Sequence, residues 1–146
     1  MRGDAPGGPI RWRLHLRAAP ERVYDAIDSD AGRAAFWAEE AVEDHRAIRF
    51  RFANGARVVA PIVARERPRR FVVDYFAGRV TIELAGDGHG GTDLALRHDG
   101  VDDGHWNEVH AGWLNVLFPL KAYVDHGVDL RNHDAQRTWD DGYADQ

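Results

Sequence analysis

Histidine is the side chain in this sequence that is best suited to chemistry, because the usual nucleophiles are almost missing. The 146-residue chain has no cysteine, one serine (Ser29) and three threonines. Disulfides, thiolate chemistry and cysteine-ligated metal sites are therefore excluded, and serine-hydrolase chemistry has little to work with. What remains is proton transfer or water activation by an imidazole near neutral pH.

Two histidines, His98 and His110, lie on predicted apolar faces. His98 alternates with leucines in a predicted strand, and His110 lies between Trp106 and Trp113 along a predicted helix. We expect both to point toward one interior, where they orient a polar ligand or act as a general acid or base. Because a lone histidine on an apolar face is more often a lining residue than a catalyst, a protein without enzymatic activity is the favoured interpretation.

The sequence lacks recognisable metal, cofactor and nucleic-acid motifs. No His-Glu-x-x-His occurs, and His105 and His110 are five residues apart, which does not place two side chains on one helix face. The glycine-rich segment 86–91 joins two predicted strands and opens no helix, so it is not a phosphate loop. The formal charge is −5, without a basic block. We therefore expect no metal, no cofactor and no nucleic-acid partner.

The elements that must position these side chains follow from the periodicity of the apolar residues. Two short helices are predicted over 20–28 and 31–38, and one long helix over 105–126, kinked at Pro119 and ended by Gly127. Asn54-Gly55 predicts a hairpin turn, and short turns between consecutive strands imply an antiparallel sheet. Alternation predicts six strands, over 10–17, 47–52, 57–65, 71–76, 79–84 and 93–98.

We interpret the chain as one α+β domain. Residues 1–9 are expected to be a flexible lead, 10–128 the domain, and 129–146 a polar tail that is either disordered or laid back across the domain. No segment reaches the roughly 18 apolar residues needed to span a bilayer, and the start has no apolar core of a secretory signal. The expected location is the cytoplasm. The ratio of 18 arginines to one lysine is typical of a GC-rich bacterial genome.

Three stretches, taken in order, resemble a known family. They are residues 13–27, residues 79–98, and Gly112-Trp113 followed by residues 120–127, and with their spacing they cover about residues 10–128. This pattern resembles the START/Bet v 1-like (SRPBCC) superfamily, in the branch of activator of Hsp90 ATPase homologue 1. The resemblance implies a helix-grip fold, in which a seven-stranded antiparallel sheet curves around a long C-terminal helix with a hydrophobic cavity between them. We expect the seventh strand to come from splitting the stretch 57–76.

The resemblance also implies a function, which is the binding of hydrophobic small molecules such as lipids or polyketides. The favoured prediction is therefore a hydrophobic or aromatic ligand in an internal cavity. One alternative is a cyclase, dehydratase or hydrolase with His98 or His110 as general acid or base. Another is a chaperone-linked or regulatory interaction module, and a homodimer stays open. The residues expected to line the cavity are Phe50, Tyr75, His98, Trp106, His110, Trp113 and Leu117.

Overall fold

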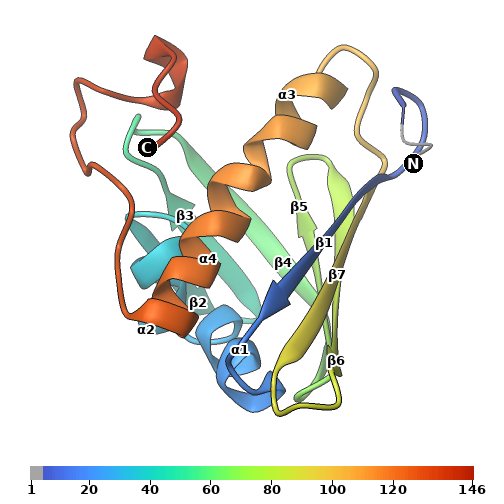
Figure 1. The fold of residues 1–146 in the computed structure, drawn as a ribbon. Coiled ribbons are helices and arrows are strands. Elements are labelled where there is room, and N and C mark those ends of the chain that lie inside the picture. Colours follow the sequence, from blue (N-terminus) through green and yellow to red (C-terminus); the bar gives the residue numbers. More distant parts are fainter. Residues whose placement is uncertain (1–4) are drawn as a thin grey trace.

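A seven-stranded antiparallel sheet curves around a C-terminal helical segment in the computed structural model, which describes residues 5–146 (Figure 1). The strand order is β1-β7-β6-β5-β4-β3-β2, so all neighbours except β1 and β7 are consecutive in sequence. This is the predicted helix-grip fold. The strands are β1 (Ile10–Leu16), β2 (Glu40–Asp44), β3 (Ala47–Arg51), β4 (Arg57–Glu66), β5 (Arg70–Tyr75), β6 (Gly78–Gly86) and β7 (Thr92–Asp99).

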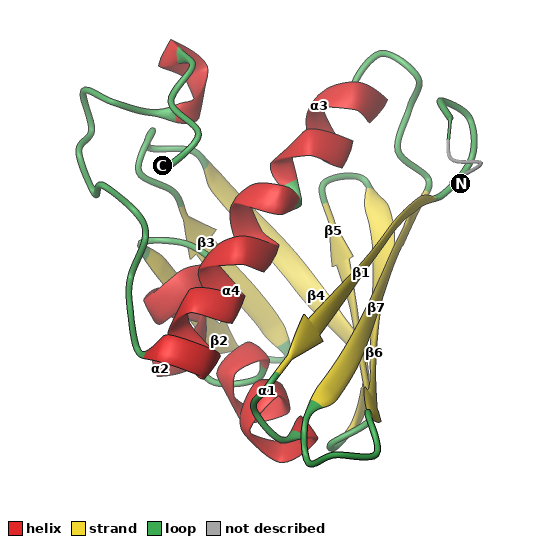
Figure 2. Ribbon diagram, in the orientation of Figure 1, coloured by secondary structure: helices red, strands yellow, loops and turns green. Residues whose placement is uncertain are grey.

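The helices all lie on the concave side of the sheet (Figure 2). Two short helices, α1 (Pro20–Ile27) and α2 (Asp30–Phe36), follow β1, and α3 (Trp106–Gly112) and α4 (Leu114–His126) follow β7. A short 3-10 helix, η1 (Trp139–Asp141), lies in the tail. No helix within residues 5–146 is long and apolar enough to cross a membrane.

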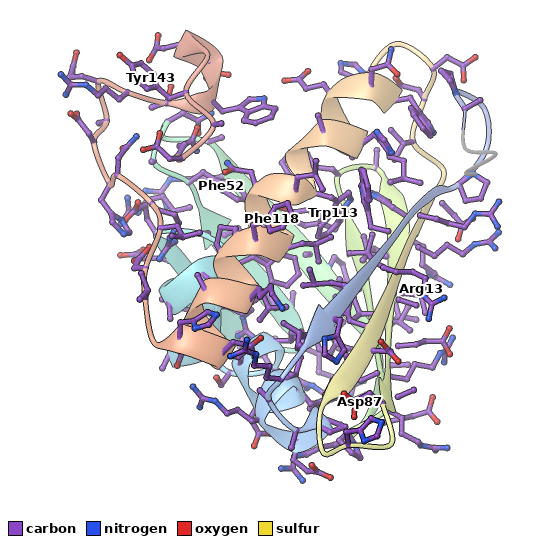
Figure 3. All side chains as sticks on the ribbon, viewed as in Figure 1. Arg13, Phe52, Asp87, Trp113, Phe118 and Tyr143 are labelled. Carbon is purple, nitrogen blue, oxygen red and sulfur yellow. The ribbon has the colours of Figure 1, made fainter. Side chains whose placement is uncertain are left out.

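The period-two pattern of β7 shows why the sheet has a buried and an exposed face. Thr92, Leu94, Leu96 and His98 are buried, whereas the residues between them are partly or fully exposed. Successive side chains of a strand point to opposite faces, so this alternation places His98 in the core and its neighbour Arg97 in solvent. Figure 3 shows Arg13 of β1 on the same outer side.

The seventh strand is β2, and the expected position in the stretch 57–76 is wrong. That stretch forms β4 and β5, both of which were already predicted as separate strands. The sequence of β2, Glu-Ala-Val-Glu-Asp, contains three acidic residues, and only Ala41 is buried. Because β2 is an edge strand with one buried side chain, it lacks the apolar alternation by which a strand is recognised.

The long helix is interrupted at Trp113, between α3 and α4, and α4 continues through Pro119. A kink at Pro119 was expected. The interruption instead lies six residues before Pro119, farther away than the carbonyl of residue 115 that the proline ring would contact, so it does not coincide with the expected position. Gly127 ends α4 with φ +65°, as predicted, because this left-handed conformation favours glycine.

The tail lies against the domain, which was one of the two alternatives left open by the sequence. The Arg131 guanidinium donates to the carbonyl oxygens of Ala38 (2.8 Å) and Ala34 (2.7 Å), beside and within α2. The Asn115 amide of α4 donates to the backbone oxygen of Gln146 (3.1 Å). The tail therefore forms a wall opposite the helix. Part of the expected flexible lead, residues 1–4, lies outside the described residues.

Candidate ligand-binding cavity

An open cavity of about 510 Å³ lies at one end of the molecule, between α3 and the tail. Its remaining walls come from the segment after α2, the β3–β4 and β5–β6 turns, and the loop that leads into α3. In Figure 3, Phe52 approaches from the sheet side and Trp113 from the helix. The volume is in the range of ligand pockets, which is about 300–1,000 Å³.

The walls of this cavity are largely aromatic. Three of the rings, Trp37, Tyr75 and Trp113, form a buried group with centroids 5.5–6.0 Å apart. Rings at these distances and tilted angles make favourable aromatic contacts and resist rearrangement. Phe76, by contrast, is 45% exposed. The six aromatic residues that line the cavity are Trp37, Phe52, Tyr75, Phe76, Trp113 and Trp139.

The hydroxyl group of Tyr75 has an unused hydrogen-bond donor. Tyr75 is only 6% exposed, and its oxygen accepts a hydrogen bond from Trp37 Nε1 (3.2 Å). Within residues 5–146, its own proton has no acceptor. Burial raises the pKa of Tyr75 well above its usual range, so the hydroxyl stays protonated.

His98 is fully buried beneath this group, and both of its ring nitrogens are bonded. Nε2 lies 2.9 Å from the carbonyl oxygen of Tyr75, and Trp113 Nε1 donates to Nδ1 (3.0 Å). Because a carbonyl only accepts and an indole only donates, these partners require the neutral tautomer with the proton on Nε2. Burial lowers the pKa of His98 and favours this neutral form.

The backbone also closes around the His98 ring. A Cβ atom at Gly78 would lie 2.8 Å from His98 Nε2 and 2.2 Å from the carbonyl oxygen of Asp99, so only glycine fits there. The ring is thus held in one position by two hydrogen bonds and close packing. This arrangement suits a structural role, and it leaves neither nitrogen available for proton transfer.

His110 occupies a different environment from His98. Its ring is stacked between the rings of Trp12 (4.6 Å) and Trp106 (4.7 Å), and its backbone carbonyl accepts a hydrogen bond from Trp12 Nε1. It is not among the residues that line the cavity. The structure therefore does not bring the two imidazoles to one cavity, and the geometry offers no shared acid–base site.

The other residues expected from the sequence divide between the cavity and the core. Tyr75 and Trp113 line the cavity, whereas Phe50, Trp106 and Leu117 do not and are buried. Phe50 packs behind the wall, with its ring centroid 5.0 Å from that of Trp37. Trp106 Nε1 donates to the carbonyl oxygen of Gly8, which ties α3 to the segment before β1.

Several lining residues were missed by sequence reasoning. Phe52 lies in the predicted strand 47–52 and Trp37 in the predicted helix 31–38, so both were visible as apolar residues. Arg131 and Trp139 come from the tail, whose sequence gives no sign of where it folds. Arg131 is held there by a hydrogen bond to Ala38, 93 residues away in the sequence, and Trp139 by one to Glu108, 31 residues away.

The mouth of the cavity carries mostly negative charge. The lining residues include four carboxylates, Glu39, Asp102, Glu108 and Asp140, and one arginine, Arg131. Three hydrogen bonds join the backbone nitrogen and guanidinium of Arg131 to the carboxylate of Asp129. Burial raises the pKa of Asp129, but the bonds to Arg131 and His133 outweigh this and hold it at about 2. No group of three or more candidate ligands for a metal occurs within the described residues.

A family model for "activator of Hsp90 ATPase homolog 1-like protein" matches residues 17–125, which is most of the chain. The chain belongs to this family. The membership agrees with the helix-grip topology and with the resemblance seen in the sequence. A comparison with curated proteins returns no match.

Solved structures show the same fold in activator of Hsp90 ATPase homolog 1-like and other proteins. SSP2350 from Staphylococcus saprophyticus superposes with a TM-score of 0.73 at 22% identity, over 84% of this chain and 96% of that one. The Aha1 dimer from Colwellia psychrerythraea gives 0.74 at 18%, over 82% and 97%. DynU16, a protein in the dynemicin biosynthetic locus, gives 0.71 at 18%, over 85% of this chain and 49% of that one. The fold is consistent with ligand binding.

Proposed function

We propose that this protein binds a hydrophobic or aromatic small molecule, such as a lipid or polyketide-like metabolite, between α3 and the tail. The observation that carries the proposal is the aromatic lining of a cavity of about 510 Å³. Ligand pockets are mostly apolar, with a few polar groups that orient the ligand. DynU16, which shares the fold, is from a biosynthetic locus, and this supports a metabolite as the kind of ligand.

Binding without chemistry is favoured by the residues around the cavity. No serine or threonine is among the lining residues within 5–146, and the chain has no cysteine. His98 lies behind the wall with both nitrogens bonded, and His110 is stacked between two indoles. A general acid or base must reach the reacting proton, and neither of these two imidazoles lines the cavity, whereas the imidazole of His105 lines it bonded to Asp102.

The test is the saturable binding of a neutral aromatic fluorophore, N-phenyl-1-naphthylamine, to the full chain. Gly112 lines the cavity, and a Cβ atom built on it meets nothing within 4 Å, so Gly112→Phe places a ring in the cavity without a backbone clash. Ala111→Phe is the matched control, because Ala111 is exposed on the same helix and does not line the cavity.

We expect the wild-type protein and Ala111→Phe to bind the fluorophore with similar affinity. Gly112→Phe should weaken binding by about tenfold or more, which corresponds to about 1.4 kcal/mol of binding free energy. Circular dichroism would confirm that both variants are folded. If the wild-type protein shows no saturable binding, or if both variants bind as it does, the proposed function is wrong.

A further inference from the structure

The charge at the mouth of the cavity suggests what kind of molecule enters it. Four carboxylates line the cavity, and the one lining arginine, Arg131, is held against Asp129. Asp102 is bonded to the imidazole of His105, which also lines the cavity. Even with both basic side chains protonated, the lining groups carry more negative than positive charge.

Two of the lining carboxylates, Glu108 and Asp140, are exposed and have no cationic partner within the described part of the chain. Glu108 of α3 accepts a hydrogen bond from Trp139 Nε1 (3.4 Å), and Asp140 of η1 accepts one from the Asn54 amide (3.0 Å). Both donors are neutral. The two acids come from opposite walls, the helix and the tail, so their negative potential overlaps at the opening.

The interior provides two further features that point to a ligand. The hydroxyl proton of Tyr75 is buried and has no acceptor within residues 5–146. A ligand that supplies a hydrogen-bond acceptor would stabilise such a donor. The surrounding indole, phenol and phenyl rings attract cations through their negative faces. The wall thus favours an organic cation over an anion of the same shape.

We propose that the ligand is a hydrophobic amine, with its ammonium group at the Glu108–Asp140 opening and a hydrogen-bond acceptor that takes the Tyr75 proton. This inference rests on the proposed function, because it assigns a chemical class to the ligand of the same cavity. The apolar body of the molecule lies among Trp37, Phe52 and Trp113. A carboxylate in place of the ammonium group is repelled at the opening.

Isothermal titration calorimetry with three molecules of nearly equal shape tests the inference. They are 2-(6-methoxynaphthalen-2-yl)ethylamine, the corresponding ethanol, and 6-methoxynaphthalen-2-ylacetate. We expect the amine to bind about five- to twentyfold more tightly than the alcohol, and the acetate to bind most weakly, since each unit charge a few ångströms away contributes about fivefold even in water. Added salt should reduce the difference.

Three variants locate the effect. Glu108→Gln should reduce the preference for the amine, whereas Glu83→Gln, an exposed acid on β6 away from the cavity, should preserve it. Tyr75→Phe should weaken all three methoxy compounds without changing their order, because the methoxy oxygen is common to them.

The outcomes separate the inference from the proposed function. If all three molecules bind equally, or if the acetate binds most tightly, the inference is wrong and the proposed function stands. If none of them binds, the inference is wrong, and the binding of N-phenyl-1-naphthylamine decides the proposed function separately. A preference for the amine that is the same in Glu108→Gln and in the wild-type protein would also overturn the inference.

Discussion

The hydrogen bonds of His98 allow the most quantitative prediction from this structure. His98→Leu keeps an apolar side chain at the position but removes both ring nitrogens. The carbonyl oxygen of Tyr75 then loses a donor at 2.9 Å, and Trp113 Nε1 loses its acceptor at 3.0 Å. His98 is fully buried, so water does not replace the lost partners without rearrangement of the core.

The expected cost follows from the two groups that lose their partners. Each buried polar group without a hydrogen bond costs about 1–3 kcal/mol, so we expect the free energy of unfolding to fall by about 2–6 kcal/mol. Domains are stable by only about 5–15 kcal/mol. For a chain of this size the loss corresponds to a decrease in melting temperature of about 5–20 °C.

Urea denaturation followed by circular dichroism measures this loss, and Trp113→Phe provides the second arm of a double-mutant cycle. Trp113→Phe leaves His98 Nδ1 unpaired and also removes part of a buried ring, so its own cost combines the two losses. The two effects should not add, because the residues share one hydrogen bond. A loss below about 1 kcal/mol in His98→Leu, or strict additivity, would refute the structural role.

The pKa of His98 predicts a pH dependence of the free energy of unfolding that tests the same structural role independently. Burial lowers this pKa from its ordinary value of 6.5, so the unfolded chain binds a proton that the folded chain does not. The contribution of His98 to the free energy of unfolding is therefore intact above pH 6.5 and is lost as the pH falls through the folded-state pKa. His98→Leu should lack this part of the acid dependence.

Two further predictions concern the segment after β1 and the tail. Asp125 is a buried carboxylate of α4 that accepts hydrogen bonds from the backbone N–H groups of residues 17 and 18 (both 3.0 Å). Asp125→Ala should therefore lower the free energy of unfolding, measured by urea denaturation, by about 2–4 kcal/mol, and Asp125→Asn should lower it by less. Equal losses in the two variants would contradict this prediction. His133 lies 2.7 Å from both Asp129 and Glu39, and hydrogen bonds to these carboxylates raise its pKa, although its exposure limits the contribution to below about 1 kcal/mol. This stabilisation is complete below pH 6.5 and is lost as the pH rises through the folded-state pKa. Hydrogen exchange in residues 129–146, corrected for intrinsic rates, should therefore accelerate as the pH rises above 6.5 in the wild-type protein but not in His133→Ala.

Much of the fold was predictable because its signals are local. The alternation in β1 and β7 and the helical spacing in α4 are properties of a few consecutive residues, and they place leucines inside and arginines outside. β2 escaped prediction because an acidic edge strand with one buried side chain has no such pattern. Its identity as a strand depends on its pairing with β3.

The candidate site was predictable only in part. Tyr75, Trp113, Phe50 and Leu117 were all expected to line the cavity; the structure places Tyr75 and Trp113 at it, whereas Phe50 and Leu117 do not line it. An apolar residue beside a cavity has the same sequence pattern as one in the packed core. Whether such a residue lines a cavity depends on where the other segments of the folded chain leave empty space, and the local sequence pattern does not predict this.

The sequence by itself determined the family, the order of the elements other than β2, the absence of thiol chemistry and the burial of His98. Tertiary structure alone decided that Tyr75 and Trp113 occupy both nitrogens of His98, that the rings of Trp12 and Trp106 enclose His110, and that the tail closes one side of the cavity. The physical reason is the range of the interactions involved. Alternation and capping act over a few residues, whereas the partners of an imidazole and the walls of a cavity come from segments that meet only when the chain has folded.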